Sequence, residues 1–149
     1  FSDVELTIAC ATELLKRVPE HDVLLTAESK GIPLAYEMSR QSGKRYILAR
    51  KSQKLYMKNA VEVDVCSITT NGLQKLYLSG EDMEYLKGKK VLLVDDVIST
   101  GESLHALEKL TEKAGGEIVG RSAVLAEGDA AERKDIIFLA PLPLLKTEE

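Results

Sequence analysis

The stretch before Pro19 carries an apolar side chain at every third or fourth position, which predicts a helix with one buried face. Ser2 and Glu5 have the spacing of a capping box at the start of this helix. Pro19 cannot continue the helical hydrogen-bond pattern, so we expect the helix to end there. The apolar face consists of Val4, Ile8, Ala11, Leu15 and Val18.

Further along the chain, short unbroken apolar runs alternate with segments of helical period. Such runs suit strands that are buried on both faces, as in a parallel sheet. Gly31 and Pro33 mark the start of a second helix, and Gly115-Gly116 marks the end of a third. This alternation predicts an α/β fold with a mainly parallel central sheet flanked by helices. The predicted strands are 22–27, 46–49, 91–94, 118–125 and 136–139.

The middle of the chain departs from this alternation. Residues Arg50–Lys58 are polar and basic and lack apolar periodicity, which predicts a mobile loop. Val61–Thr70 and Leu73–Leu78 are β-rich runs on either side of Asn71-Gly72. Because Asn-Gly between two such runs is a strong turn signal, we expect a β-hairpin here.

The composition is that of one globular domain spanning residues 1–149. A formal net charge of −4 argues against a broad cationic face, so we expect no nucleic-acid partner. No apolar run approaches ~18 residues and no signal peptide is visible, which predicts a cytoplasmic protein without membrane contact. Cys10 and Cys66 lack metal-ligand spacing and are predicted to be free thiols. The chain begins with Phe1 rather than Met, which leaves room for residues upstream.

The most informative segment is VLLVDDVISTGES, residues 91–103. A buried strand is expected to end in two adjacent carboxylates, Asp95 and Asp96, followed by a loop with hydroxyls and a glycine, and then a helix. Ligands of open α/β sheets bind beyond the carboxyl ends of strands, and the free N–H groups of a helix N-terminus suit a phosphate. Carboxylates instead accept hydrogen bonds from sugar hydroxyls or hold a hard cation. The segment therefore predicts a site for a phosphorylated sugar.

The same segment closely resembles the signature with which type I phosphoribosyltransferases bind 5-phosphoribosyl-1-pyrophosphate (PRPP). The resemblance implies that Asp95 and Asp96 are catalytic, line the ribose hydroxyls, and hold Mg²⁺ directly or through water. P-loop ATPases also place acidic residues after a strand, but they need a Gly-x-x-x-x-Gly-Lys-Ser/Thr loop that this chain lacks. Receiver domains also carry an acidic pair after a strand, but they place it near the start of the fold, whereas only 53 residues follow Asp96 in this chain. The implied 5′-phosphate loop consists of Val97, Ile98, Ser99, Thr100, Gly101, Glu102 and Ser103.

Two further segments resemble the same family, in the family's order along the chain. The segment 28–31 follows a predicted strand and looks like the pyrophosphate loop. The sequence RKSQKLY at 50–56 is similar to the flexible catalytic loop of adenine-type enzymes, with Arg50 and Lys54 as implied catalytic cations. Part of this loop would reach the pyrophosphate across a dimer interface. The implied pyrophosphate-binding residues are Glu28, Ser29, Lys30, Gly31 and Lys51.

The resemblance implies a Mg²⁺-dependent, homodimeric enzyme of nucleotide salvage that transfers the phosphoribosyl group of PRPP to a nitrogenous base, nearest to an adenine-like purine. Two departures leave the base open. Adenine enzymes carry a catalytic glutamate in the hairpin region, where this chain has Thr69, Thr70 and Asn71. Enzymes for 6-oxopurines often have an acidic residue near position 99, where this chain has Ser99. The alternatives are a salvage enzyme for xanthine or orotate and a non-catalytic module that senses PRPP or a nucleotide.

The family covers the base with a variable segment called the hood. Little of this chain precedes the first predicted helix. We therefore expect a hood that is absent or truncated, or one formed by Pro141–Leu145.

Overall fold

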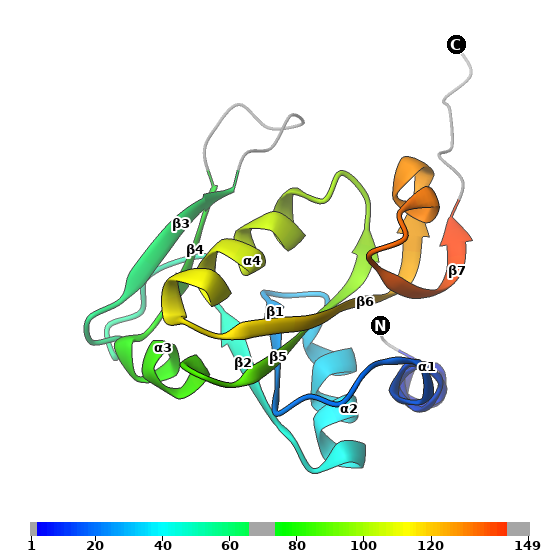
Figure 1. Cartoon of the computed structure of the whole chain (residues 1–149), viewed down its shortest axis with the longest axis horizontal. Coiled ribbons are helices and arrows are strands. Elements are labelled where there is room, and N and C mark those ends of the chain that lie inside the picture. Colours follow the sequence, from blue (N-terminus) through cyan, green and yellow to red (C-terminus); the bar gives the residue numbers. More distant parts are fainter. Residues whose placement is uncertain (1–2, 66–73, 143–149) are drawn as a thin grey trace.

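The computed structural model describes residues 3–65 and 74–142, which surround a five-stranded sheet (Figure 1). The strand order is β2-β1-β5-β6-β7, and every neighbouring pair runs parallel. The predicted α/β fold with a mainly parallel central sheet and flanking helices is therefore confirmed. The strands are β1 (Val23–Ala27), β2 (Arg45–Ala49), β5 (Lys90–Ile98), β6 (Glu117–Glu127) and β7 (Ile137–Leu142).

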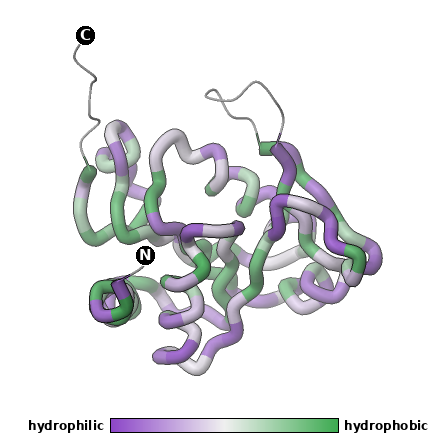
Figure 2. The backbone as a smooth tube through the Cα atoms, turned by 180° about the vertical axis from the view of Figure 1, so that it is seen from behind, coloured by the Kyte–Doolittle hydropathy of each residue, from purple (hydrophilic) through white to green (hydrophobic). Residues whose placement is uncertain are grey.

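Helices cover both faces of this sheet (Figure 1). On one face, α1 and α2 pack over the side chains of Leu24, Leu92 and Val94. On the other face, α3, α4 and a separate antiparallel hairpin pack over Leu25 and Leu93. In Figure 2 the coil of α1 carries both hydrophobic and hydrophilic colours, as expected of a helix with one buried side. These elements are α1 (Val4–Arg17), α2 (Ile32–Ser42), β3 (Val61–Val65), β4 (Gln74–Leu78), α3 (Gly80–Leu86) and α4 (Glu102–Ala114).

The ends of the helices follow local capping chemistry. The N-cap of α1 is Asp3, whose side chain accepts a hydrogen bond from the backbone N–H of Leu6, so the expected cap at Ser2 was wrong. The second helix begins at Ile32, with Gly31 as its N-cap, as predicted. The last long helix ends at Ala114, and its C-cap, Gly115, adopts a left-handed backbone conformation with a φ of 81°, so the glycine stops the helix as predicted.

Strand β5 is longer than its apolar run. The apolar run Val91–Val94 was expected to end in Asp95 and Asp96, and the observed strand continues beyond them through Val97 to Ile98. On one side, the pairing with β1 stops at Leu93, while on the other side β6 stays paired along the whole length. The reason is that the ladder to β6 supplies backbone partners beyond the point where β1 diverges. The two carboxylates consequently stand within a strand that has one open edge.

Two short elements were not expected, the hairpin was, and some predicted features lie outside the described residues. The short helix α3 follows Ser79, whose hydroxyl caps it by accepting from the N–H of Asp82. A 3₁₀ turn, Gly128–Glu132, joins β6 to β7. The hairpin between β3 and β4 is confirmed by its antiparallel register. The predicted Asn71-Gly72 turn, with Thr69, Thr70 and Cys66, and the part of the proposed hood segment from residue 143 onward all lie outside the described residues.

Two further observations bear on the sequence predictions. Pro141 and Leu142, the first residues of the proposed hood segment, form the end of β7 and pair with Ala126 and Glu127 of β6. Cys10 is buried in α1 as a free thiol, and its burial raises the pKa of that thiol. Within residues 3–65 and 74–142, no helix has the length and apolar character needed to cross a bilayer.

Candidate functional site

The site begins where the chain order of the sheet reverses. From β1 the chain proceeds outward to β2, whereas from β5 it proceeds in the opposite direction to β6 and β7. Helices on the two sides diverge at such a switch point, which leaves a crevice at the carboxyl edge of the strands. The segments 28–31, 50–51 and 95–103 follow or end strands β1, β2 and β5 and therefore reach this same edge.

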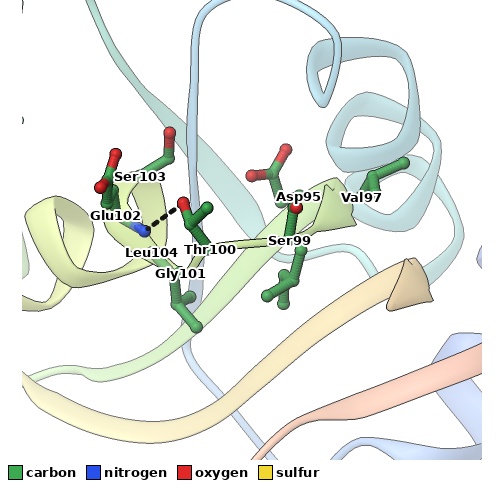
Figure 3. Close-up of a pocket in the computed structure, with 9 residues that line it drawn as sticks. Asp95, Val97, Ser99, Thr100, Gly101, Glu102, Ser103 and Leu104 are labelled. Carbon is green, nitrogen blue, oxygen red and sulfur yellow. Dashed lines mark hydrogen bonds between the residues drawn. The ribbon is translucent and has the colours of Figure 1, made fainter. Parts of the chain in front are cut away.

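A cavity of about 100 Å³ lies between the end of β5 and the start of α4. Figure 3 shows that the side-chain oxygens of Asp95, Thr100 and Ser103 point to the same side of the loop. The first N–H groups of α4 have no partners within the helix. That of Glu102 makes a long 3.5 Å hydrogen bond to Oγ1 of Thr100, and the next ones, of Ser103 and Leu104, can serve a bound anion. The lining residues are Asp95, Val97, Ile98, Ser99, Thr100, Gly101, Glu102, Ser103 and Leu104.

Gly101 gives the loop its shape. Its φ of 84° is a left-handed conformation that side-chain-bearing residues rarely adopt. A Cβ at this position would also lie 2.9 Å from Nη1 of Arg133, a residue of the segment between β6 and β7. The guanidinium of Arg133 is held there by two hydrogen bonds to Asp135, of 2.8 and 2.6 Å. A fixed cation thus backs the loop that was predicted to bind a phosphate.

The two aspartates are differently placed. The Oδ1 atom of Asp95 accepts a 2.8 Å hydrogen bond from the backbone N–H of Asp96. Burial raises the pKa of Asp95 to about 8, with the neighbouring carboxyl of Asp96 acting in the same direction and Lys51 opposing the shift. At neutral pH this raised pKa favours the protonated form of the Asp95 carboxyl in the free protein, and ligands that bring positive charge or hydrogen-bond donors favour its ionised form.

A second group of residues joins the ends of β1 and β2. The carboxylate of Glu28 accepts a 2.8 Å hydrogen bond from the backbone N–H of Lys51 and lies 3.7 Å from Nη1 of Arg50. Gly31 approaches Asp95 so closely that a Cβ on the glycine would stand 3.6 Å from Oδ1 of the aspartate. Three separate predicted segments therefore meet around Asp95, and the charge of Lys51 in one of them acts on its carboxyl group.

Other predicted site residues make no described contact with Asp95. Lys54 donates a 3.0 Å hydrogen bond to Ser52 within its own loop. Ser29 and Lys30 are exposed on the turn after β1. The roles of Lys54, Ser29 and Lys30 stay predictions, because their described contacts include no partner at the site.

Asp96 lines a different cavity, of about 520 Å³, between α1 and the ends of β5 and β6. The walls of this cavity are mostly apolar, since Leu6 and Cys10 of α1 face Val124 and Leu125 of β6 across it. Apolar walls with a few polar groups are typical of small-molecule sites. The cavity adjoins the phosphate-type loop, because Val97 lines both.

One polar residue at this edge was not predicted from the sequence. The hydroxyl of Ser99 donates a 2.7 Å hydrogen bond to Oε1 of Glu127, the last residue of β6. The parallel register explains the meeting, because Ile98 pairs with Ala126 and the next residue on each strand is Ser99 or Glu127. Glu127 belongs to no motif and lies 28 positions away in sequence, so only strand pairing could have revealed it.

The residues at this edge suit Mg²⁺ only in partnership with a substrate. In the described parts of the chain, no group of three or more His, Cys, Asp or Glu side chains could hold a metal by itself. Mg²⁺ is commonly bound by one or two carboxylates together with water and substrate phosphates. The pair Asp95 and Asp96 fits that mode of binding.

Comparisons with known proteins agree with this geometry. Residues 5–140 match the family model described as phosphoribosyl transferase domain. The chain is 39% identical over 124 residues to a hypoxanthine/guanine phosphoribosyltransferase of Methanococcus voltae, covering 83% of this chain and 63% of that protein. It is 36% identical over 100 residues to an adenine phosphoribosyltransferase of Thermotoga sp. (strain RQ2), covering 67% of this chain and 56% of that protein.

The fold is also that of a solved relative. The crystal structure of an adenine phosphoribosyltransferase from Thermoanaerobacter pseudethanolicus superposes with a TM-score of 0.81 at 22% identity, covering 94% of this chain and 83% of the other. The chain belongs to the type I phosphoribosyltransferase family, and the predicted membership is confirmed. It spans less than two thirds of the length of the Methanococcus and Thermotoga proteins.

Proposed function

We propose that this protein is a purine phosphoribosyltransferase, which joins a base to the anomeric carbon of PRPP and releases pyrophosphate. The observation that carries the proposal is the convergence on Asp95 of three segments that the sequence motifs had singled out. A phosphate-sized loop with a helix N-terminus lies on one side of this residue, and the basic segment at Lys51 lies on the other. This is the pattern of groups that a sugar bearing a phosphate and a pyrophosphate requires.

Each end of PRPP has a matching region. The 5′-phosphate would lie in the cavity at residues 97–104, against the first N–H groups of α4 and with Arg133 behind the loop. The ribose hydroxyls would donate to Asp95 and Asp96. The pyrophosphate would lie over Gly31 near Arg50 and Lys51, where positive charge stabilises the negative charge that develops on a leaving group.

Mg²⁺, when bound, would neutralise charge on the pyrophosphate, and Asp95 and Asp96 would hold it directly or through water. The residues of the chain do the rest of the positioning. The ionised form of Asp95 is the one that accepts from ribose hydroxyls, so substrate binding favours loss of its proton. Residues Arg50–Lys58 would cover the pyrophosphate and keep water from the anomeric carbon.

The base would approach from the side of β6. In a single displacement at an anomeric carbon, the incoming group attacks the face opposite the leaving group. The pyrophosphate region follows β1 and β2, so the opposite side of β5 is that of β6 and α1. The largely apolar cavity between Leu6 and Val124 lies there and offers walls for a flat purine.

Pyrophosphate release from PRPP and Mg²⁺, measured with adenine, hypoxanthine, guanine, xanthine and orotate in turn, tests this function. We expect turnover with at least one purine, because relatives specific for adenine and for hypoxanthine/guanine are similar to this chain to comparable degrees. A cytoplasmic homodimer is the expected form of the enzyme. Tight PRPP binding by calorimetry without turnover on any base would instead support the second candidate, a PRPP-sensing module.

A further inference from the structure

Bond formation at the base releases a proton that some group must accept. When a ring nitrogen of a purine bonds to the anomeric carbon, the C–O bond to pyrophosphate breaks and its electron pair leaves with the pyrophosphate. The imidazole ring of the purine cannot keep its N–H proton and also carry the new bond in a neutral product. A proton acceptor is therefore required on the β6 side of Asp95, where the base would approach.

Ser99 lies at this edge of the sheet, but its hydroxyl is a poor proton acceptor at neutral pH. Its hydrogen-bond partner Glu127 brings a carboxylate to the same point of the sheet edge, at 2.7 Å from the serine oxygen. Glu127 is half-buried rather than fully solvated. It follows directly after the pair Leu125 and Ala126, of which Leu125 lines the apolar cavity.

Glu127 also lies on the side from which a base must arrive. The pyrophosphate region follows β1, Asp95 and Asp96 lie on β5, and Glu127 ends β6, so the carboxylate and the leaving group flank the sugar position from opposite sides. Asp96 and Asp95 are committed to the sugar hydroxyls and the cation. Asp3 also lines the apolar cavity, but its Oδ1 accepts from the N–H of Leu6 as the cap of α1. Among the hydrogen bonds of the described residues, the carboxylate of Glu127 is joined only to the hydroxyl of Ser99, so it stays free to accept a proton.

We propose that Glu127 is the catalytic proton acceptor for the base, and that Ser99 orients its carboxylate through their hydrogen bond. The imidazole-ring proton of the base passes to a Glu127 oxygen as the new N–C bond forms, and it then passes to solvent after the nucleotide departs. This assignment rests on the proposed phosphoribosyltransferase function and deepens it.

Steady-state kinetics of matched variants test the assignment with the purine that the wild type turns over best. Glu127→Gln keeps the shape and the acceptor oxygen for Ser99 but cannot take a proton. We expect its kcat to fall about 10²- to 10⁴-fold, the usual contribution of a general base, with the KM for PRPP little changed. Ser99→Ala should cost far less, because it removes the orienting hydrogen bond and keeps the carboxylate.

Two controls separate chemistry from structure. Asp129→Asn, an exposed change two positions further along the chain, should leave kcat unaltered. The double variant Ser99→Asp with Glu127→Gln moves the carboxylate to the neighbouring strand end and should recover part of the lost kcat. Thermal unfolding of every variant identifies any that fold poorly, and PRPP calorimetry identifies loss of the phosphate loop.

The outcomes separate a failure of the Glu127 assignment from a failure of the proposed function. A wild type that turns over while Glu127→Gln keeps full kcat overturns the Glu127 assignment alone. Equal losses in Ser99→Ala and Glu127→Gln, with weakened PRPP binding in both, would mean that the pair only braces the loop, which also overturns it. A wild type without turnover on any base overturns the proposed function and the inference together.

Discussion

The side chain of Glu28 and the backbone of Lys51 are joined by a 2.8 Å hydrogen bond that connects the turn after β1 to the basic segment after β2. The same carboxylate lies 3.7 Å from Arg50. A carboxylate beside a proposed pyrophosphate position would repel the ligand if it acted directly. Its contacts indicate instead that it positions the two cationic residues.

Removal of this connection should weaken PRPP binding. In Glu28→Ala the N–H of Lys51 loses its acceptor, and we expect the KM for PRPP to rise about five-fold, the equivalent of about 1 kcal/mol for a lost hydrogen bond. Glu28→Gln keeps an acceptor oxygen and removes a negative charge, so its KM should not rise. Initial rates of pyrophosphate release at varied PRPP measure both values. An unchanged KM in Glu28→Ala would contradict the positioning role.

Simultaneous replacement of Asp95 and Asp96 by asparagine should abolish turnover. Asparagine fits the same strand positions and leaves the ladder to β6 intact, so the fold is expected to survive. What disappears is the charge that accepts from ribose hydroxyls and holds a cation. Pyrophosphate release is the measurement, with circular dichroism as the control for folding. Normal turnover by the double variant would show that the sugar binds elsewhere.

The raised pKa of Asp95, about 8, predicts how the free protein responds to pH. Between the ordinary carboxyl pKa and about 8, the folded state holds a proton here that the unfolded state has lost. Stability from this group is therefore greatest at acid pH and declines as the pH rises, by at most about 1.4 kcal/mol per pH unit. Asp95→Asn removes the dependence.

Thermal unfolding without ligand, followed from pH 5 to pH 8.5, checks this prediction. We expect the Tm of Asp95→Asn to exceed that of the wild type by a margin that widens as the pH rises. Glu117→Gln, an exposed change at the opposite end of β6, serves as the control and should follow the wild type. A margin that stays constant with pH would contradict the raised pKa.

The close contact between Gly31 and Thr26 predicts a coupled pair of substitutions. A Cβ on Gly31 would lie 2.5 Å from Oγ1 of Thr26, a fully buried hydroxyl without a hydrogen-bond partner in the described structure. Gly31→Ala should therefore destabilise the protein by about 1–3 kcal/mol through overpacking. Thr26→Ala removes the obstructing atom, so the double variant should be less destabilised than the sum of its parts. Urea unfolding gives the four free energies, and strict additivity would contradict this coupling.

The sequence predicted much of the architecture because hydrophobic periodicity and the Gly and Pro residues at the ends of elements are local signals. The apolar runs at Val23–Ala27 and Val91–Val94 lie at the centre of the sheet, and Gly31 and Gly115 bound helices as expected. The family resemblance also assigned residues 28–31, Arg50, Lys51, Lys54 and 95–103 to a single ligand. The segments 28–31, 50–51 and 95–103 do reach the same edge of the sheet, whereas the described hydrogen bond of Lys54 is to Ser52 in its own loop. Local pattern was sufficient wherever a feature depends on neighbours in the chain.

The rest depends on partners that are distant in the sequence. Nothing in the apolar pattern indicates that Asp95 and Asp96 stay within the strand, because the ladder that keeps them there comes from β6. The pairing of Ser99 with Glu127 and the approach of Arg133 to Gly101 arise in the same way. The elements that were not foreseen, α3 and the 3₁₀ turn, are too short for a periodic signal.

Strand β5 owes the second half of its length to β6 alone, since its pairing with β1 ends at Leu93. The thirteen-residue segment VLLVDDVISTGES therefore does not form the binding site by itself. A fragment that stopped after α4 would contain every one of these residues and still lack the neighbouring strand, the glutamate and the arginine that give the loop its form. Grafting this motif into another protein would require the transfer of residues 117–135 along with it.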